Sequence, residues 1–165
     1  MTISIVKNGT IARTCERCVH DIEESLFSED ENVLVFDVDG VVVKQIPTYF
    51  NGVRGHDGYK LDENAIKVIE AAEKKVDHVV LWSKFPNYLT VMGRKIFNKG
   101  PYHVFGSFDR KADSEPYKPL QIINKNLRNI VGIEDNRWFY PRDRVVTMHP
   151  GRNLMSALLE ALDKI

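Results

Sequence analysis

The chain lacks several features that would point to particular classes of protein. Its 165 residues include 23 acidic and 23 basic side chains, so the formal net charge is zero and no overall field attracts nucleic acid or an anionic membrane. No apolar run approaches the length of a membrane span, and the N-terminal segment lacks the pattern of a signal peptide. We therefore expect a cytoplasmic protein that makes no contact with a membrane.

Cysteine is nearly absent, and this limits metal and redox roles. The two cysteines, Cys15 and Cys18, are not matched elsewhere by a second Cys or His pair with the spacing of a zinc site. Both belong to a stripe of apolar residues with helical spacing at positions 11–26. The pattern predicts a helix over about residues 10–27, in which the cysteines serve packing.

The composition is that of one soluble globular domain, with 43% hydrophobic and 28% charged residues. Short apolar runs alternate with amphipathic segments, which is typical of βαβ units and a parallel sheet. The pattern predicts one α/β domain over residues 1–165, with an N-terminal extension that carries a helix at 1–30 and a core at 33–150. The expected strands are 33–37, 79–82, 102–105, 130–133 and 145–146, and the expected helices are about 64–72, 86–100, 119–123 and 152–164.

The most informative stretch is an apolar strand that ends in two aspartates. Residues 33–36 are Val-Leu-Val-Phe, Asp37 and Asp39 follow, and Gly40 supplies a turn that a bulkier residue would resist. Carboxylates at the mouth of a buried strand repel each other and resist desolvation, so they need a cation or a shared proton. Ligands bind at the carboxyl ends of strands in open α/β sheets. We therefore expect a hard divalent cation here, with Mg²⁺ favoured by oxygen ligands.

Three further polar signals lie at or just beyond the ends of later elements. Ser83 ends the second long strand, Lys118 precedes a short helix, and Glu134, Asp135 and Asn136 follow the fourth strand. Each signal alone is weak, because serine is common at strand ends and a single lysine is usually a solvated surface charge. Their order along the chain, taken with the two aspartates, is much more specific.

The four signals together resemble the motifs of the haloacid dehalogenase superfamily of aspartate-nucleophile phosphotransferases, over about residues 33–150. In that family an apolar strand is followed by Asp-x-Asp, a second strand ends in Thr or Ser, a lysine precedes a helix, and an acidic pair or Asp-Asn follows a later strand. The resemblance implies a Rossmann-like three-layer α/β sandwich with a central parallel sheet. Core elements fill the intervals 40–82 and 84–117, so we expect no cap domain and an open site.

The resemblance also implies a role for each residue in the hydrolysis of a phosphomonoester. Asp37 would attack phosphorus and form an aspartyl-phosphate. Asp39 would protonate the leaving oxygen and then take a proton from the attacking water. Ser83 would donate a hydrogen bond to a phosphoryl oxygen, and Lys118 would offset negative charge on the phosphate and the nucleophile.

The same resemblance implies how Mg²⁺ would be held. Its ligands would be the carboxylate of Asp37, the main-chain carbonyl of Asp39 and an oxygen of the fourth motif. Two registers of that motif stay open, because the acidic pair is either Glu134 with Asp135 or Asp135 with Asn136. Asp135 belongs to both registers and is the preferred ligand.

The substrate is expected to be a phosphorylated small molecule or macromolecule. Lys84, beside Ser83, is an alternative to Lys118, and Gly40 is expected to line the substrate site. Many relatives carry Thr after this glycine, where the present chain has Val41. The alternatives are a polynucleotide end phosphatase, which the neutral net charge does not favour, and a catalytically silent protein that binds phosphorylated ligands or a partner. An open site also fits a homo-oligomer in which a neighbouring subunit encloses the substrate.

Two more groups of residues flank the expected site. Segment 40–61 is expected to form a hairpin or flap over the site, because glycine and proline interrupt it. Its candidates for substrate contact, or else for a solvated loop, are Arg54, His56, Asp57 and Tyr59. Near the C-terminus, Arg142, Arg144 and Arg152 are expected either to form a small basic edge beside the site or to be solvated.

Overall fold

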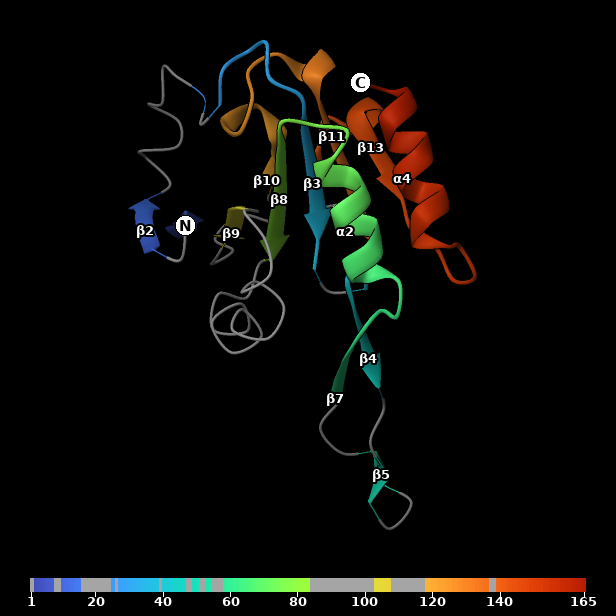
Figure 1. Cartoon of the computed structure of the whole chain (residues 1–165). Coiled ribbons are helices and arrows are strands. Elements are labelled where there is room, and N and C mark those ends of the chain that lie inside the picture. Colours follow the sequence, from blue (N-terminus) through green and yellow to red (C-terminus); the bar gives the residue numbers. More distant parts are fainter. Residues whose placement is uncertain are drawn as a thin grey trace.

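A seven-stranded sheet forms the centre of the molecule (Figure 1). The computed structural model describes residues 2–7, 10–15, 25, 27–38, 40–46, 49–50, 53–54, 58–83, 103–107, 118–136 and 139–165. The strands of this sheet, in spatial order, are β13 (Val145–Thr147), β11 (Ile130–Glu134), β3 (Val33–Asp37), β8 (His78–Ser83), β9 (His103–Ser107), β1 (Thr2–Lys7) and β2 (Thr10–Cys15). Neighbours from β13 to β9 pair in parallel, whereas β1 pairs antiparallel with both β9 and β2. The predicted α/β class with a parallel sheet is confirmed.

Strands β3 and β11 are buried at every position, as expected for parallel strands whose two faces are both covered. One face packs against α2 (Ala65–Glu73) and α4 (Leu154–Asp163), which Figure 1 shows on the same side of β3. The opposite face forms a second, smaller core that includes Phe27, Trp82, Leu120 and Phe139. The central strands are therefore held rigidly between two apolar layers.

The helices follow the predicted pattern where the structure describes them. The side chain of Asn153 caps α4 by accepting a hydrogen bond from the amide of Met155 at 2.8 Å. The helix predicted at 119–123 is a short 3-10 helix, η2 (Leu120–Ile122), and two further 3-10 turns are η3 (Leu127–Asn129) and η4 (Arg142–Arg144). The helix predicted at 86–100 lies outside the described residues. Within the described part of the chain, no helix is long and apolar enough to cross a bilayer.

The prediction of a helix from residue 10 onward is wrong at its start. Residues 10–15 form β2, which pairs with β1 in an antiparallel hairpin whose closing pair is Lys7 and Thr10. Two local signals outweigh the helical spacing: the Asn-Gly dipeptide at 8–9 is typical of a two-residue hairpin loop, and β-branched residues such as Ile11 and Thr14 favour a strand. The N-terminal segment is thus part of the main sheet. Cys18 lies outside the described residues.

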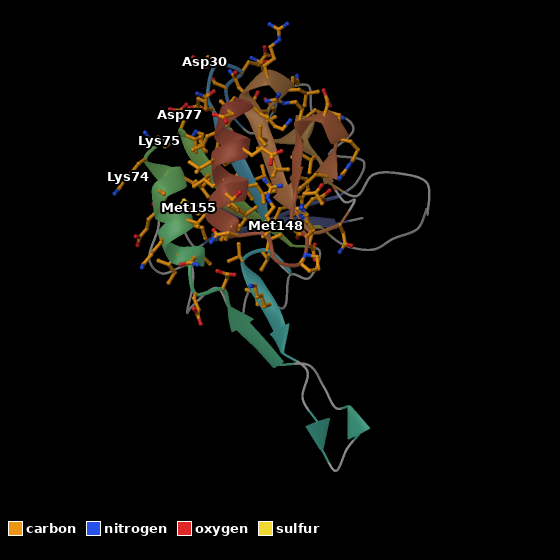
Figure 2. All side chains as sticks on the ribbon, turned by 90° about the vertical axis from the view of Figure 1, so that its right-hand side faces the viewer. Asp30, Lys74, Lys75, Asp77, Met148 and Met155 are labelled. Carbon is orange, nitrogen blue, oxygen red and sulfur yellow. The ribbon has the colours of Figure 1, made fainter. Side chains whose placement is uncertain are left out.

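A long β-arm leaves the body of the molecule after β3. At its base β4 (Val43–Ile46) pairs antiparallel with β7 (Gly58–Leu61), and nearer its tip β5 (Tyr49–Phe50) pairs with β6 (Val53–Arg54). Figures 1 and 2 both show this arm projecting from the end of the body at which β3 and β8 terminate. The predicted hairpin is confirmed, but its described residues extend away from the sheet instead of covering it. His56 and Asp57 lie outside the described residues.

Candidate active site

Three of the four predicted motifs end on neighbouring parallel strands. Strand β3 lies between β11 and β8, with Ile133 opposite Phe36 and Asp37 opposite Trp82. Glu134 therefore lies beside Asp37 on one side, and Ser83 ends the strand on the other side. Because parallel strands present their carboxyl ends at one edge of the sheet, the structure brings these motifs together at a single place.

Asp37 is a buried carboxylate, with only 5% of its surface exposed. Its Oδ1 accepts a hydrogen bond from the amide of Val38 at 2.9 Å. Desolvation of a carboxylate is costly, so a residue of this type persists at a buried strand end only with compensating partners. Asp37 is thus buried where β3 ends at the carboxyl edge of the sheet.

The loop after β3 touches the loop after β11. Gly40 has a φ of +78°, and a Cβ built on it would overlap the carboxylate of Asp135, with 2.6 Å to Cγ and 3.2 Å to Cβ. Glycine is therefore needed at position 40 for two reasons, the left-handed backbone and the close approach of Asp135. This contact joins the first and fourth motifs in space.

A tight turn fixes Gly40. Its amide donates to the carbonyl of Val43 at 2.7 Å, and the carbonyl of Val38 accepts from the amides of Val41, Val42 and Val43. All four valines are fully buried in the core beneath α2 and α4. Position 41 therefore lies in an apolar environment, which suits valine.

The side chain of Glu134 is completely buried, and both of its oxygens have partners within the chain. Oε2 accepts from the amide of Phe139 at 2.8 Å, and Oε1 forms an ion pair with the guanidinium of Arg142. Asn136, by contrast, is exposed and donates from Nδ2 to Oδ1 of Asp135 at 3.3 Å. Of the three residues in the fourth motif, Glu134 is therefore the one held by the interior of the chain, while Asp135 and Asn136 lie beyond the end of β11.

Lys118 is carried to the same region by a small parallel sheet. Strand β10 (Lys118–Pro119) pairs with β12 (Phe139–Tyr140), and Lys118 lies opposite Phe139. The amide of Phe139 is the one that Glu134 holds, so the third and fourth motifs are linked through the backbone. The sequence predicts Lys118 just ahead of a short helix, and in the structure it begins a two-residue strand that leads into the 3-10 helix η2.

Two predicted site residues, Asp39 and Lys84, lie outside the described residues, and Ser83 and Lys118 are described by their backbone alone. Among the residues that the structure describes, no three His, Cys, Asp or Glu side chains are grouped closely enough to hold a metal ion. The predicted ligand set also includes two groups of other kinds, the main-chain carbonyl of Asp39 and the side-chain amide of Asn136.

The three arginines near the C-terminus do not form one basic edge. Arg144 donates to three main-chain carbonyls, one of them at Ile130 where β11 begins, far from the acidic residues. Arg152 pairs with Glu160, and its hydrogen bond lowers the pKa of that carboxyl. Arg142 is the member of this set that reaches the carboxyl end of β11.

Sequence reasoning missed the partnership between Glu134 and Arg142. The available signal was the alternation along β11, which places Ile130, Gly132 and Glu134 on the same face of the strand. Gly132 packs against Phe139, so a carboxylate two residues further along that face also points inward. An inward-facing carboxylate requires a partner from the chain, and Arg142 supplies it.

Comparison with models of known protein families and with curated proteins finds no match to this chain.

Proposed function

We propose that this protein is a Mg²⁺-dependent phosphomonoesterase that acts through an aspartyl-phosphate, with the capless, three-layer Rossmann-like fold of haloacid dehalogenase phosphatases. One observation carries the proposal: Asp37 ends the central strand between the strands that end in Ser83 and Glu134, and Gly40 lies against Asp135. The parallel sheet, with α2 and α4 on one face, supports the proposed fold. We place this activity in the cytoplasm, either in a single chain or in a homo-oligomer.

Mg²⁺ suits the residues at this edge. Asp37 ends β3 and Asp135 follows the adjacent strand β11, so both would supply carboxylate oxygens, which hard divalent cations prefer as ligands. The residues that would hold the ion are Asp37, Asp135 and Asn136, with the main-chain carbonyl of Asp39. When bound, Mg²⁺ reduces the electrostatic repulsion between the phosphate and these carboxylates.

The chemistry follows from the order of the residues. A carboxylate oxygen of Asp37 attacks phosphorus, and the bond from phosphorus to the leaving oxygen breaks as Asp39 gives that oxygen a proton. Water then attacks the aspartyl-phosphate while Asp39 takes its proton. The bond between phosphorus and Asp37 breaks, which releases inorganic phosphate and restores the carboxylate. Ser83 and Lys118 stabilise the negative charge on the phosphoryl oxygens.

The decisive test is hydrolysis of p-nitrophenyl phosphate with Mg²⁺ and with EDTA. We expect Asp37→Asn to lower kcat by at least about 1,000-fold, because an amide oxygen is a poor nucleophile. Asp30→Asn is the matched control, since Asp30 is exposed and lies at the end of the body opposite the arm (Figure 2). Equal rates for the parent and Asp37→Asn, or a rate unaffected by EDTA, would contradict the proposal.

The substrate class is identified by a second measurement. The panel contains phosphorylated metabolites, phosphopeptides and oligonucleotides with 3′- or 5′-phosphates, each compared by kcat/KM. Selective hydrolysis of the oligonucleotides would identify a polynucleotide end phosphatase. Binding of phosphorylated ligands without hydrolysis would identify a catalytically silent protein.

A further inference from the structure

Glu134 has no part in the proposed chemistry, yet it is a fully buried carboxylate at the edge where negative charge gathers. A third carboxylate would add to the repulsion between Asp37 and Asp135. Its charge is instead matched by Arg142, and its second oxygen accepts the amide of Phe139 at 2.8 Å. A carboxylate bound in this way is directed toward the chain and away from a ligand.

These contacts close the loop that carries Asp135 and Asn136. The carbonyl of Glu134 accepts from the amide of Met148 at 2.6 Å, which fixes the start of the loop against β13. Its side chain holds the amide of Phe139, which fixes the end of the loop. Arg142 contacts both the strand end and the loop, because its guanidinium pairs with Glu134 and lies 3.5 Å from the carbonyl oxygen of Asn136.

The same contacts extend to the third motif. Phe139, held by Glu134, pairs in parallel with Lys118 through β12 and β10. The backbone that carries Lys118 is therefore connected to the backbone that carries Asp135 through one buried side chain. Displacement of Glu134 would move the acidic loop and the lysine together.

We propose that Glu134 and Arg142 form a positioning pair that sets the place of Asp135, Asn136 and Lys118, and that Glu134 is not itself a metal ligand. This inference rests on the proposed phosphatase function. Residues that orient metal ligands without touching the metal typically change metal affinity by about 10- to 100-fold when they are replaced. The expected signature is therefore a weaker response to Mg²⁺ on replacement of either partner.

The experiment compares Glu134→Gln, Arg142→Gln and the double variant with the parent. Two quantities are measured: the Mg²⁺ concentration that gives half-maximal hydrolysis of p-nitrophenyl phosphate, and the rise in Tm that Mg²⁺ produces without substrate. We expect each single variant to raise the half-saturating concentration by about 10-fold and to reduce the rise in Tm. The double variant should resemble the single variants, because the two residues act as one unit.

Two further variants distinguish a loss of positioning from a loss of folding. Arg142→Lys keeps the positive charge beside the buried carboxylate, so it should fold and give an intermediate Mg²⁺ requirement. Arg152→Gln is the matched control, because Arg152 is a neighbouring arginine that pairs with Glu160 and not with the acidic loop. It should leave the Mg²⁺ requirement unchanged.

Three results would overturn the inference. If Arg142→Gln tightens Mg²⁺ binding while Glu134→Gln weakens it, Glu134 is a ligand with which the arginine competes. If the effects of the two single variants multiply in the double variant, the residues act independently. If Tm without Mg²⁺ falls but the Mg²⁺ requirement does not change, the pair serves stability alone. A parent protein with neither Mg²⁺-dependent hydrolysis nor a Mg²⁺-dependent Tm defeats the proposed function as well.

Discussion

Among the described residues, the buried polar side chain at the amino ends of β3 and β11 is an uncharged amide, whereas the carboxyl ends of these strands carry two buried carboxylates, Asp37 and Glu134. Asn124 is fully buried at the amino end, where Nδ2 donates to the carbonyls of Ser28 and Glu31 at 3.3 and 2.8 Å, and Oδ1 accepts from the amide of Asn126 at 2.8 Å. Figure 2 shows Asp30 and Asp77 at this end, opposite the arm, and both are exposed.

The two ends of the strands differ in what their buried polar side chains need from their surroundings. A buried amide whose donors and acceptor are all used costs little, so the amino end is built to connect loops. A buried carboxylate needs a cation or several donors to offset desolvation. Glu134 has Arg142 and the amide of Phe139, and Asp37 is the carboxylate to which we assign the proposed chemistry. Substitutions at the two ends should therefore have separable effects on activity and on the free energy of unfolding.

The largest effect is expected at Gly40. Gly40→Ala would force a Cβ into the carboxylate of Asp135 in a left-handed backbone, and we expect a loss of about 2–3 kcal/mol in the free energy of unfolding. Displacement of Asp135 should also lower kcat/KM by about 100-fold. Gly151→Ala is the matched control, because Gly151 has a φ of +86° and no atom within 4 Å of the Cβ. It should cost about 1 kcal/mol with full activity, and equal kinetics in the two variants would refute the role of the contact with Asp135.

A smaller effect, confined to the free energy of unfolding, is expected at the amino ends of β3 and β11. Asn124→Ala leaves the carbonyls of Ser28 and Glu31 without their donor, so urea denaturation should show a loss of about 2 kcal/mol. The kcat of the folded protein should not change. Asn129→Ala, which removes a single bond to the carbonyl of Glu29, is the control and should cost less than about 1 kcal/mol. A change in Mg²⁺ requirement in either variant would show that the two ends are coupled.

The smallest effects concern two glutamates outside the site. Burial, with a lesser contribution from Glu70, raises the pKa of Glu73, so its charged form is less favourable in the folded protein. Stability from this group is present at low pH and is lost as the pH rises through its raised pKa. Glu73→Gln should therefore add about 0.5 kcal/mol or less at neutral pH and nothing in acid.

Glu160→Gln tests a pKa shift in the opposite direction. Because the hydrogen bond from Arg152 lowers the pKa of Glu160, this carboxylate stabilises the fold at neutral pH, and its contribution disappears as the pH falls through the lowered pKa. The substitution should slightly lower stability at neutral pH and have no effect in strong acid. Urea denaturation of both glutamine variants across this pH range provides the measurement, and pH-independent differences would contradict the assignment.

Local patterns predicted the central part of the fold well. Residues 33–37 form a strand as expected, because a continuous apolar run of this length suits a strand buried on both faces. The strand ends also indicated where Asp37 and Ser83 would lie, since parallel strands finish at one edge. The N-terminal hairpin was mispredicted because helical spacing at 11–26 and strand propensity at 10–15 conflict within one short segment.

The remaining features depend on residues that are distant in sequence. Gly40 meets Asp135 through the pairing of β3 with β11, which no local pattern encodes. The sequence left two pairs open, Glu134 with Asp135 or Asp135 with Asn136, whereas in the structure Glu134 is buried against Arg142 and the amide of Phe139. The sequence pattern identified the acidic residues. Only their contacts in the structure distinguish a residue that is bound by other parts of the chain from one that could bind a ligand.

The turn at residues 38–43 has a mechanical consequence. The arm is attached to β3 through four fully buried valines and one carbonyl, that of Val38, which accepts three amide hydrogen bonds. Between Gly40 and β4 the described backbone is thus held by buried side chains and by hydrogen bonds to one carbonyl, so the base of the arm and the backbone beside Asp135 belong to the same packed unit.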